Sequence, residues 1–200
     1  MESPAVALFA IIYFNGTHCF APVPLLLFGL WQFHYIYRTC IYPLRIRNPS
    51  KPMPVLIAGM AFVFQVLNSY INARWISEFG ATHSFSMLGF TTLAGLVLFF
   101  AGWLLNHHSD QVLLNLRKPG ETGYKIPFGG GFRFVSSPNY LGELLEWCGW
   151  ALISWSWAGA SFAIFTAANL IPRAMRHHKW LHGKFANYPK TRRAILPFIL

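Results

Sequence analysis

Residues 136–159, SSPNYLGELLEWCGWALISWSWAG, combine a membrane-length apolar run with polar side chains at its start. Asn139, Glu143 and Glu146 recur at i, i+4 and i+7, so a helix would place them on one face. Pro138 follows two serines and is typical of a helix start, and the helix N-terminus would tolerate the Glu143 charge about one turn further on. Carboxylates beside hydrocarbon are costly, so they need partners or a function.

The composition of the whole chain indicates a membrane protein. Of 200 residues, 54% are hydrophobic and 11% are charged, which is more apolar than a soluble domain usually is. A helix needs about 20 mostly apolar residues to cross a bilayer. We count six spans, at residues 3–14, 22–37 (continuing through 39–44), 53–70, 86–105 and 140–171, the last crossing twice with a turn near residues 157–159. The predicted fold is an all-α, multi-pass transmembrane helical bundle that forms a single domain over residues 1–200.

Basic residues flank these runs mainly on one side. When the spans are followed alternately, the clusters within residues 38–51, 117–133 and 173–193 fall on the same side, and Arg74 falls on the other. By the positive-inside rule that side is cytoplasmic, in either a bacterial cytoplasmic membrane or the endoplasmic reticulum, and an even span count puts both termini there. The formal net charge of +10 fits anionic lipid headgroups or an anionic ligand better than nucleic acid. No removable signal peptide is expected.

Polar residues recur at helical spacing at four span ends on this side. The four stripes are Tyr35, Arg38 and Tyr42; Asn106, Asp110 and Arg117; Asn139, Glu143 and Glu146; and Arg173 and His177. If they converge, they line a polar cavity open to the cytoplasm, with cations for phosphates and carboxylates for ribose hydroxyls or for bracing arginines. The alternative is that they are interfacial side chains that reach water, or that they form internal ion pairs.

Other features favour structural roles. Cys19, Cys40 and Cys148 form no CxxC pair and are expected to be free thiols. The paired histidines complete no zinc signature, so no metal centre is expected. Residues 117–134 form a long glycine-rich, basic loop that is a candidate ligand lid, and its GGGF segment is either a simple turn or part of that lid.

Four segments together carry a family resemblance. They are FHYIYRTCIYPL at residues 33–44, NHHSDQVLLNLRKPGETGYKIPFGGGF at 106–132, SSPNYLGELLEWCGWALISWS at 136–156 and HHKWLHGKFANYPKTRRAILPFIL at 177–200. The chain resembles the steroid 5-alpha-reductases (3-oxo-5-alpha-steroid 4-dehydrogenases), membrane enzymes that reduce the Δ4 double bond of 3-oxo steroids with NADPH. The likeness is densest over residues 106–200. Family members have seven spans, one of them preceding the part that aligns with Met1, so a bacterial or truncated member is implied.

The resemblance implies an NADPH site built from members of the polar stripes. The family's cofactor contacts fall on Asn106, Asp110, Arg117, Tyr124, Asn139, Glu143, Arg173 and His177, with Arg38 joining them. Glu146 is then expected only to brace the site. Lys125 stands where the family commonly has arginine, which keeps the charge but loses the bidentate fork.

The resemblance also implies two catalytic residues. Glu2 aligns with the glutamate of a family Gln-Glu-Leu-Pro stretch, and Tyr35 aligns with a tyrosine. Hydride can add to the β-carbon of an enone only if the developing enolate oxygen is stabilised. Hydrogen bonds from Tyr35 and a protonated Glu2 would supply this stabilisation, and the α-carbon is then protonated.

We therefore expect an NADPH-dependent oxidoreductase that acts on 3-oxo-Δ4 steroids. Reductases of other enone or enoyl lipids, of the enoyl-thioester or polyprenol type, are close alternatives because they share the cofactor half. A methyltransferase that uses S-adenosylmethionine is disfavoured by Arg38, Arg117 and Arg173, and a non-catalytic sterol-binding protein by the intact cofactor residues. Expected partners are a steroid or similar flat apolar lipid and membrane lipids, with no nucleic acid and no obligate protein partner. The C-terminus is expected to be cytoplasmic.

Overall fold

The computed structural model of the protein describes residues 2–46, 54–80, 89–117, 121 and 123–200. Over these ranges every named element is helical, and an isolated bridge between Val135 and Arg193 is the nearest approach to a strand. The basic residues Arg47, Lys51 and Lys118, and the first residues of the runs at 53–70 and 86–105, lie outside the described ranges. The predicted all-α fold is confirmed for the part of the chain that the structure describes.

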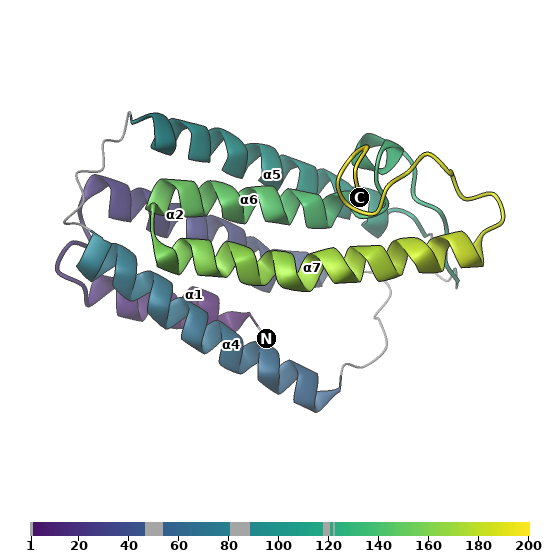
Figure 1. Ribbon diagram of the computed structural model, residues 1–200. Coiled ribbons are helices and arrows are strands. Elements are labelled where there is room, and N and C mark those ends of the chain that lie inside the picture. The colour runs from purple at the N-terminus through teal and green to yellow at the C-terminus, as the bar shows by residue number, and fades with distance from the viewer. Residues whose placement is uncertain (1, 47–53, 81–88, 118–120, 122) are drawn as a thin grey trace. The chain divides into compact units, whose positions relative to one another are not determined.

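Within the described ranges, six long helices coincide with the six apolar runs (Figure 1). They are α1 (Ser3–Phe14), α2 (Pro22–Ile36), α4 (Val55–Arg74), α5 (Phe90–Leu114), α6 (Pro138–Ser154) and α7 (Trp157–Lys184). The shorter segments are a π-helix η1 (Tyr37–Ile41), α3 (Tyr42–Arg45), a π-helix η2 (Trp75–Phe79) and a 3-10 turn η4 (Gly130–Arg133). Among the described residues, the helical stretches Val55–Phe79 and Phe90–Leu114 are long and apolar enough to cross a membrane. These two stretches indicate a membrane protein, and the count of six spans stays a prediction.

The turn inside the longest apolar run lies slightly before its predicted place at residues 157–159. The chain breaks at Trp155, whose φ is 41°, and α7 already begins at Trp157. Ser156 explains this start, because its Oγ accepts a hydrogen bond from the Gly159 backbone N–H at 2.9 Å, as an N-cap residue does. Ser156 therefore marks the position of the turn better than Gly159 does.

The described chain divides into two compact units. The first unit comprises Met1–Leu96 and Trp150–Phe162, and the second comprises Val97–Gly149 and Ala163–Leu200. The boundary falls within α5, α6 and α7. Whether the whole chain acts as a single domain stays a prediction.

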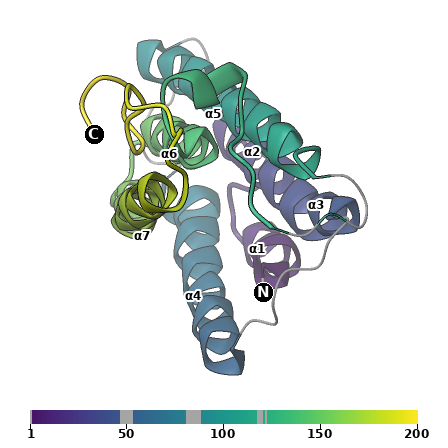
Figure 2. The same cartoon turned by 90° about the vertical axis from the view of Figure 1, so that its right-hand side faces the viewer.

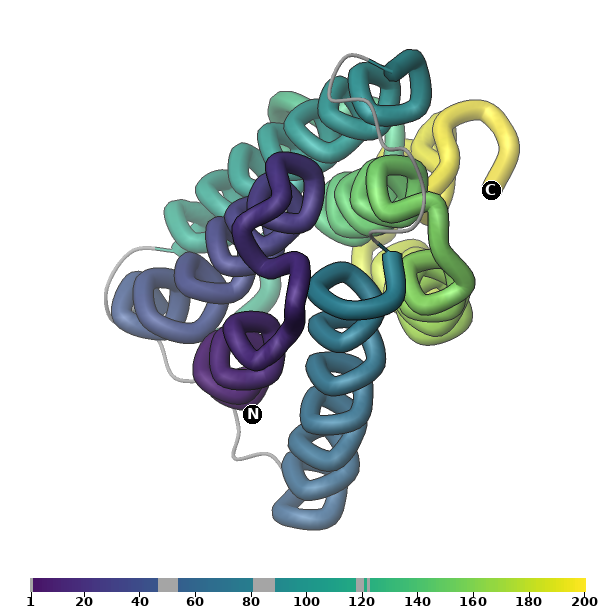
Figure 3. The backbone as a smooth tube through the Cα atoms, turned by 90° about the vertical axis from the view of Figure 1, so that its left-hand side faces the viewer, coloured from purple at the N-terminus to yellow at the C-terminus, as the bar shows by residue number. Residues whose placement is uncertain are grey.

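Trp31 on α2 lies at the centre of the first unit. Its indole N–H donates to the backbone oxygen of Ala5 at 2.9 Å, and its ring stacks on Phe9 with the ring centroids 4.3 Å apart. The Trp31 ring also contacts Trp150 and Phe162. Aromatic pairs of this kind stabilise a core beyond the area that they bury. They join α2 to α1, which lies beside α4 in Figures 2 and 3.

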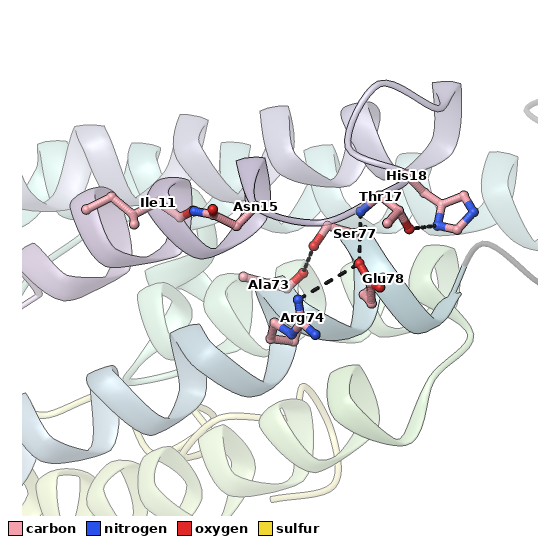
Figure 4. Close-up of polar contacts among 8 residues, drawn as sticks. All are labelled: Ile11, Asn15, Thr17, His18, Ala73, Arg74, Ser77 and Glu78. Atoms are coloured by element: carbon pink, nitrogen blue, oxygen red, sulfur yellow. Dashed lines mark hydrogen bonds and ion pairs between the residues drawn. The ribbon is translucent and has the colours of Figure 1, made fainter.

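A hydrogen-bonded lock joins the end of α1 to the end of α4 (Figure 4). The backbone N–H of His18 donates to the Ser77 backbone oxygen at 2.8 Å, and that of Thr17 donates to the Glu78 carboxylate at 2.8 Å. Arg74 Nη1 lies 3.9 Å from the same Glu78 oxygen. Because the C-terminal ends of the two helices meet here, α1 and α4 run parallel, and α2 runs antiparallel to α1.

Gly16 is the point of closest approach in this lock, since a Cβ atom there would lie 2.2 Å from Ser77 Oγ. We expect Gly16→Ala to lower the free energy of unfolding by about 1–3 kcal/mol through overpacking, measured as a lower midpoint of thermal unfolding in detergent. Gly29→Ala on α2 is the matched control, because nothing lies within 4 Å of its added Cβ. The control should keep or slightly raise the midpoint. Equal midpoints for the two variants would contradict the lock.

Candidate functional site

In the second unit, α5 and α6 meet at two glycines. A Cβ atom on Gly102 would lie 2.4 Å from the Glu146 backbone nitrogen, and one on Gly142 would lie 2.4 Å from the Asn106 backbone nitrogen. The two helices therefore pack backbone against backbone, the approach that small residues permit between membrane helices. Figures 1 and 3 show α6 between α5 and α7. This contact fixes the height at which the predicted site residues of α5 and α6 lie.

Asn106 and Asn139 are brought into direct contact at this helix pair. Asn106 Nδ2 donates a hydrogen bond to the Asn139 backbone oxygen at 2.9 Å. Asp110, one turn along α5, is 2% exposed, and Asn106 is 5% exposed. Glu143, one turn along α6 from Asn139, is half-buried, and Glu146 is fully buried. Amide and carboxylate groups that can bind ligand hydroxyls therefore collect at one end of the pair.

The predicted stripe of Asn106, Asp110 and Arg117 is wrong in its last member, because Arg117 lies in the loop after α5. Because α5 ends at Leu114, Arg117 does not lie on the helix, and its eleven-residue spacing from Asn106 does not place it on the same face. Arg117 Nη1 instead donates to the Gly123 backbone oxygen at 3.5 Å. The Pro-Gly pair at residues 119–120 of the sequence opposes continuation of the helix. Only the loop itself can bring Arg117 to a ligand.

Trp180 on α7 links two of the predicted residues, Tyr124 and His177. The Tyr124 ring meets Trp180 edge-on with centroids 4.6 Å apart, and the His177 ring stacks on Trp180 at 6.0 Å. Tyr124 is 68% exposed, and Arg173 and His177 are exposed one turn apart on α7. The loop and α7 thus form a basic and aromatic surface. Trp180 belongs to this surface, although the sequence indicated no role for it.

The glycine-rich segment forms a tight turn against α5. Gly129 and Gly130 have φ values of 93° and 50°, in the region that favours glycine. A Cβ atom on Gly130 would also lie 2.3 Å from the His108 ring. Backbone conformation and close packing therefore account for these glycines, and a phosphate-binding role is not needed to explain them.

A buried polar cluster that the sequence did not predict ties the C-terminal segment to the start of α6. Ser136 Oγ lies 2.6 Å from His178 Nδ1 and 2.7 Å from Tyr188 Oη. The Ser136 backbone N–H donates to the Arg193 backbone oxygen at 2.8 Å. These residues come from three separate stretches of sequence, so helical spacing gave no signal for the cluster.

The sequence also indicated no role for Arg192, which the structure places in a buried contact. Its side chain is 3% exposed, and its guanidinium carbon lies 4.8 Å from the Phe128 ring centroid and 5.2 Å from that of Tyr188. A weakly hydrated guanidinium between two rings is a favourable cation–π arrangement. Its Nη1 has no hydrogen-bond partner within the described part of the chain. The charge therefore holds the glycine-rich loop to the C-terminal segment.

In the first unit, Glu2 and Tyr35 lie at the same end of α1 and α2. Trp31 and Gln32 of α2 bond to the backbone oxygens of Ala5 and Val6 at 2.9 and 3.0 Å, which sets the level of the two antiparallel helices. Glu2, at the N-cap position of α1, is about one turn before Ala5, and Tyr35 is about one turn after Trp31. Both residues therefore occupy the next level, where Tyr35 is 4% exposed and Glu2 is half-buried.

The stripe that begins at Tyr35 is interrupted by the π-helix Tyr37–Ile41. A π-helix has more residues per turn than an α-helix, so the predicted angular spacing of Tyr35, Arg38 and Tyr42 does not hold. Arg38 and Tyr42 still meet, because the guanidinium carbon of Arg38 lies 4.9 Å from the Tyr42 ring centroid.

A row of buried polar residues on α4 is a further feature that sequence reasoning missed. The row consists of Gln65, Asn68, Ser69 and Asn72, which are all 9% exposed or less. Their spacing of i, i+3, i+4 and i+7 inside an apolar helix was the available signal. Gln65 Nε2 donates to Tyr35 Oη at 3.3 Å, and Asn72 Nδ2 donates to Asn68 Oδ1 at 2.8 Å.

The predicted site residues divide between the units. Glu2, Tyr35 and Arg38 belong to the first unit, and the other eight belong to the second. The structure places Glu2 level with Tyr35, Asn106 against Asn139, and Tyr124 with His177 around Trp180. The cofactor and catalytic roles of all eleven residues stay predictions.

Comparison with known proteins gives one consistent family. The sequence model of the family described as 3-oxo-5-alpha-steroid 4-dehydrogenase matches residues 51–200. The steroid 5-alpha-reductase DET2 of Solanum lycopersicum is 48% identical over 202 residues, covering 100% of this chain and 78% of the relative. That of Arabidopsis thaliana is 44% identical over 206 residues, covering 100% of this chain and 79% of the relative. The 3-oxo-5-alpha-steroid 4-dehydrogenase 1 of Rattus norvegicus is 46% identical over 174 residues, covering 87% of this chain and 67% of the relative.

His178 should make the stability of the second unit depend on pH. It lies beyond the apolar run that ends at residue 171; partial burial lowers its pKa, and the neighbouring His182, Arg193 and His177 lower it further. A histidine whose folded pKa lies below its unfolded value binds fewer protons when folded, so stability is lost as pH falls through about 6.5. We expect the thermal midpoint to drop between about pH 7.5 and about pH 5.5. His178→Gln should drop less, and an identical pH dependence in this variant would contradict the assignment.

Proposed function

Since the chain belongs to the 3-oxo-5-alpha-steroid 4-dehydrogenase family, we propose that it reduces the Δ4 double bond of 3-oxo steroids to 5α-dihydro steroids with NADPH. The structural observation that supports this proposal is that Glu2 and Tyr35 lie at the same height along α1 and α2. A carboxyl group and a phenol at one level suit a flat apolar substrate with one oxygen. The names of the relatives favour a steroid over enoyl-thioester or polyprenol substrates.

The residues of the second unit fit NADPH chemically. Buried Asn106 and Asp110 offer an amide and a carboxyl group for ribose hydroxyls, with Asn139 and Glu143 beside them. Phosphates need cations and hydrogen-bond donors, which the arginines, Tyr124 and His177 among the predicted cofactor residues supply. The proposed cofactor ligands in the second unit are Asn106, Asp110, Arg117, Tyr124, Asn139, Glu143, Arg173 and His177, and Arg38 of the first unit is proposed as a further ligand. The surplus of arginines favours a cofactor with a 2′-phosphate.

The proposed chemistry assigns separate roles to Glu2 and Tyr35. Hydride transfer to the β-carbon of the enone is the chemistry that NADPH would supply when bound. Charge then develops on the 3-oxygen, to which Tyr35 and a protonated Glu2 donate hydrogen bonds. A proton from water then adds to the α-carbon, which restores the ketone and leaves the protons of Tyr35 and Glu2 in place. The buried position of Tyr35 strengthens its hydrogen bond, because little water competes for the oxygen.

We further propose a multi-pass arrangement in which α1, α2, α4, α5, α6 and α7 each cross the membrane. Two of these helices pass a length and hydropathy test by themselves. The basic residues at the ends of α2, α5 and α7 favour a cytoplasmic C-terminus and a cofactor cavity that opens to the same side.

The activity is tested by incubating the purified protein in detergent with NADPH and progesterone or testosterone and separating the products by chromatography. We expect the 5α-dihydro steroid from the wild-type protein. Glu2→Gln, which keeps the size of the side chain but lacks the carboxyl proton, should reduce turnover at least about tenfold. Tight NADPH binding without steroid product would reject the steroid assignment and leave a reductase of another enone.

Glu143→Ala tests the cofactor site. Because Glu143 lies one turn from Asn139 on α6, we expect its loss to weaken NADPH affinity at least about tenfold, measured by fluorescence titration. Asn169→Ala is the control, because the exposed Asn169 amide donates to the Phe165 backbone oxygen within α7 at 2.8 Å. NADPH affinity equal to wild type in Glu143→Ala would assign this carboxylate a structural role.

A further inference from the structure

Gln65 on α4 makes a buried polar contact with Tyr35 on α2. The side chain is 9% exposed, and its Nε2 donates to Tyr35 Oη at 3.3 Å. Tyr35 is itself 4% exposed, so the bond lies away from water. The other polar residues of the row differ, because Asn68 and Asn72 bond to each other within α4.

We infer that Gln65 is a positioning residue for Tyr35, which rests on the proposed role of Tyr35 at the substrate oxygen. An amide N–H can only donate, so the Tyr35 oxygen is the acceptor in this bond. The phenolic proton is therefore directed to a different acceptor. In the reacting complex that acceptor is the 3-oxygen of the steroid.

The ring and the hydroxyl of Tyr35 are fixed by different contacts. The ring packs against Trp31 and His34, with centroids 4.9 and 5.0 Å away. Such packing fixes the ring plane but does not set the direction in which the O–H bond points as it rotates about the C–O bond. The Gln65 bond restricts that rotation, and donation to the phenol oxygen also polarises its O–H bond. Gln65 thus orients the Tyr35 proton and strengthens its donation.

Packing alone does not account for a glutamine at this position. Gln65 Oε1 is buried and has no hydrogen-bond partner within the described residues. Leaving such an acceptor unpaired is unfavourable, whereas methionine would fill a similar volume without an unpaired polar atom. An amide is therefore unfavourable here if it serves only to fill space, whereas its Nε2 donates a hydrogen bond across helices to Tyr35.

The position along the chain agrees with this role. Gln65 lies about three turns before Ser77, and Glu2 lies about four turns before Gly16, which meets Ser77 in the lock between the parallel helices α4 and α1. Gln65 and Glu2 are therefore at similar heights. Tyr35 shares the level of Glu2, so all three polar side chains lie at one height in the first unit.

The test is a double-mutant cycle with Gln65→Met and Tyr35→Phe, measured as steroid turnover in detergent. Gln65→Met should lower kcat about five- to tenfold and leave the dissociation constant of NADPH unchanged. Tyr35→Phe should lower kcat further. The double variant should be no slower than Tyr35→Phe, because Gln65 acts only through the hydroxyl that this variant lacks.

Ser69→Ala is the control for altered packing of α4. Ser69 is fully buried one turn from Gln65, and its hydroxyl has no partner within the described part of α4 and its surroundings. It should retain wild-type kcat. Gln65→Asn provides a second variant, since its shorter amide keeps polarity but cannot reach Tyr35; it should show the same loss of kcat as Gln65→Met.

Each outcome separates the inference from the proposed function. Multiplicative losses in the double variant, or wild-type kcat in both Gln65 variants, would overturn the positioning role while leaving Tyr35 catalytic. Wild-type kcat in Tyr35→Phe would instead overturn the proposed role of Tyr35 itself. A thermal midpoint that falls together with kcat in Gln65→Asn, with losses that multiply in the cycle, would assign Gln65 a purely structural role.

Discussion

Close approach of helix backbones at glycine is the constraint on which both units depend. In the first unit Gly16 lets the end of α1 reach Ser77, and the backbone and carboxylate bonds of the lock can then form. In the second unit Gly102 and Gly142 let α5 and α6 touch, so that Asn106 reaches Asn139. Helices in an apolar solvent gain little from burying more apolar surface, so close packing and polar contacts must hold them together. The glycines make both possible at the same places.

Much of the fold could be predicted because an apolar run of helical length has few alternative structures. Each of the six runs contains a helix in the part that the structure describes, including the short α1. The predicted helix boundaries and periodicities are wrong where a local contact or turn decides the structure instead of the apolar composition. Ser156 caps α7 and moves the turn, η1 alters the periodicity after Tyr35, and α5 ends before Arg117.

The candidate site was predictable only where its residues share one helix. Asn139 with Glu143, and Arg173 with His177, keep the spacing expected of α6 and α7. Contacts between distant segments left no comparable trace in a single sequence. Ser136 with Tyr188 and Gln65 with Tyr35 are such pairs, because each depends on how two elements pack. The family resemblance identified individual positions but gave no information about these pairings.

The Gly102–Gly142 contact also has a thermodynamic consequence for ligand affinity. Because the two helix backbones touch, the distance between Asn106 and Asn139 is set when the chain folds rather than when a ligand arrives. Groups that are already ordered lose little conformational entropy on binding, so more of their interaction energy is expressed as affinity. The helix pair is thus a preorganised part of the second unit. Tyr124, a proposed cofactor ligand on the loop between α5 and α6, is largely exposed, so it would lose more side-chain freedom on binding.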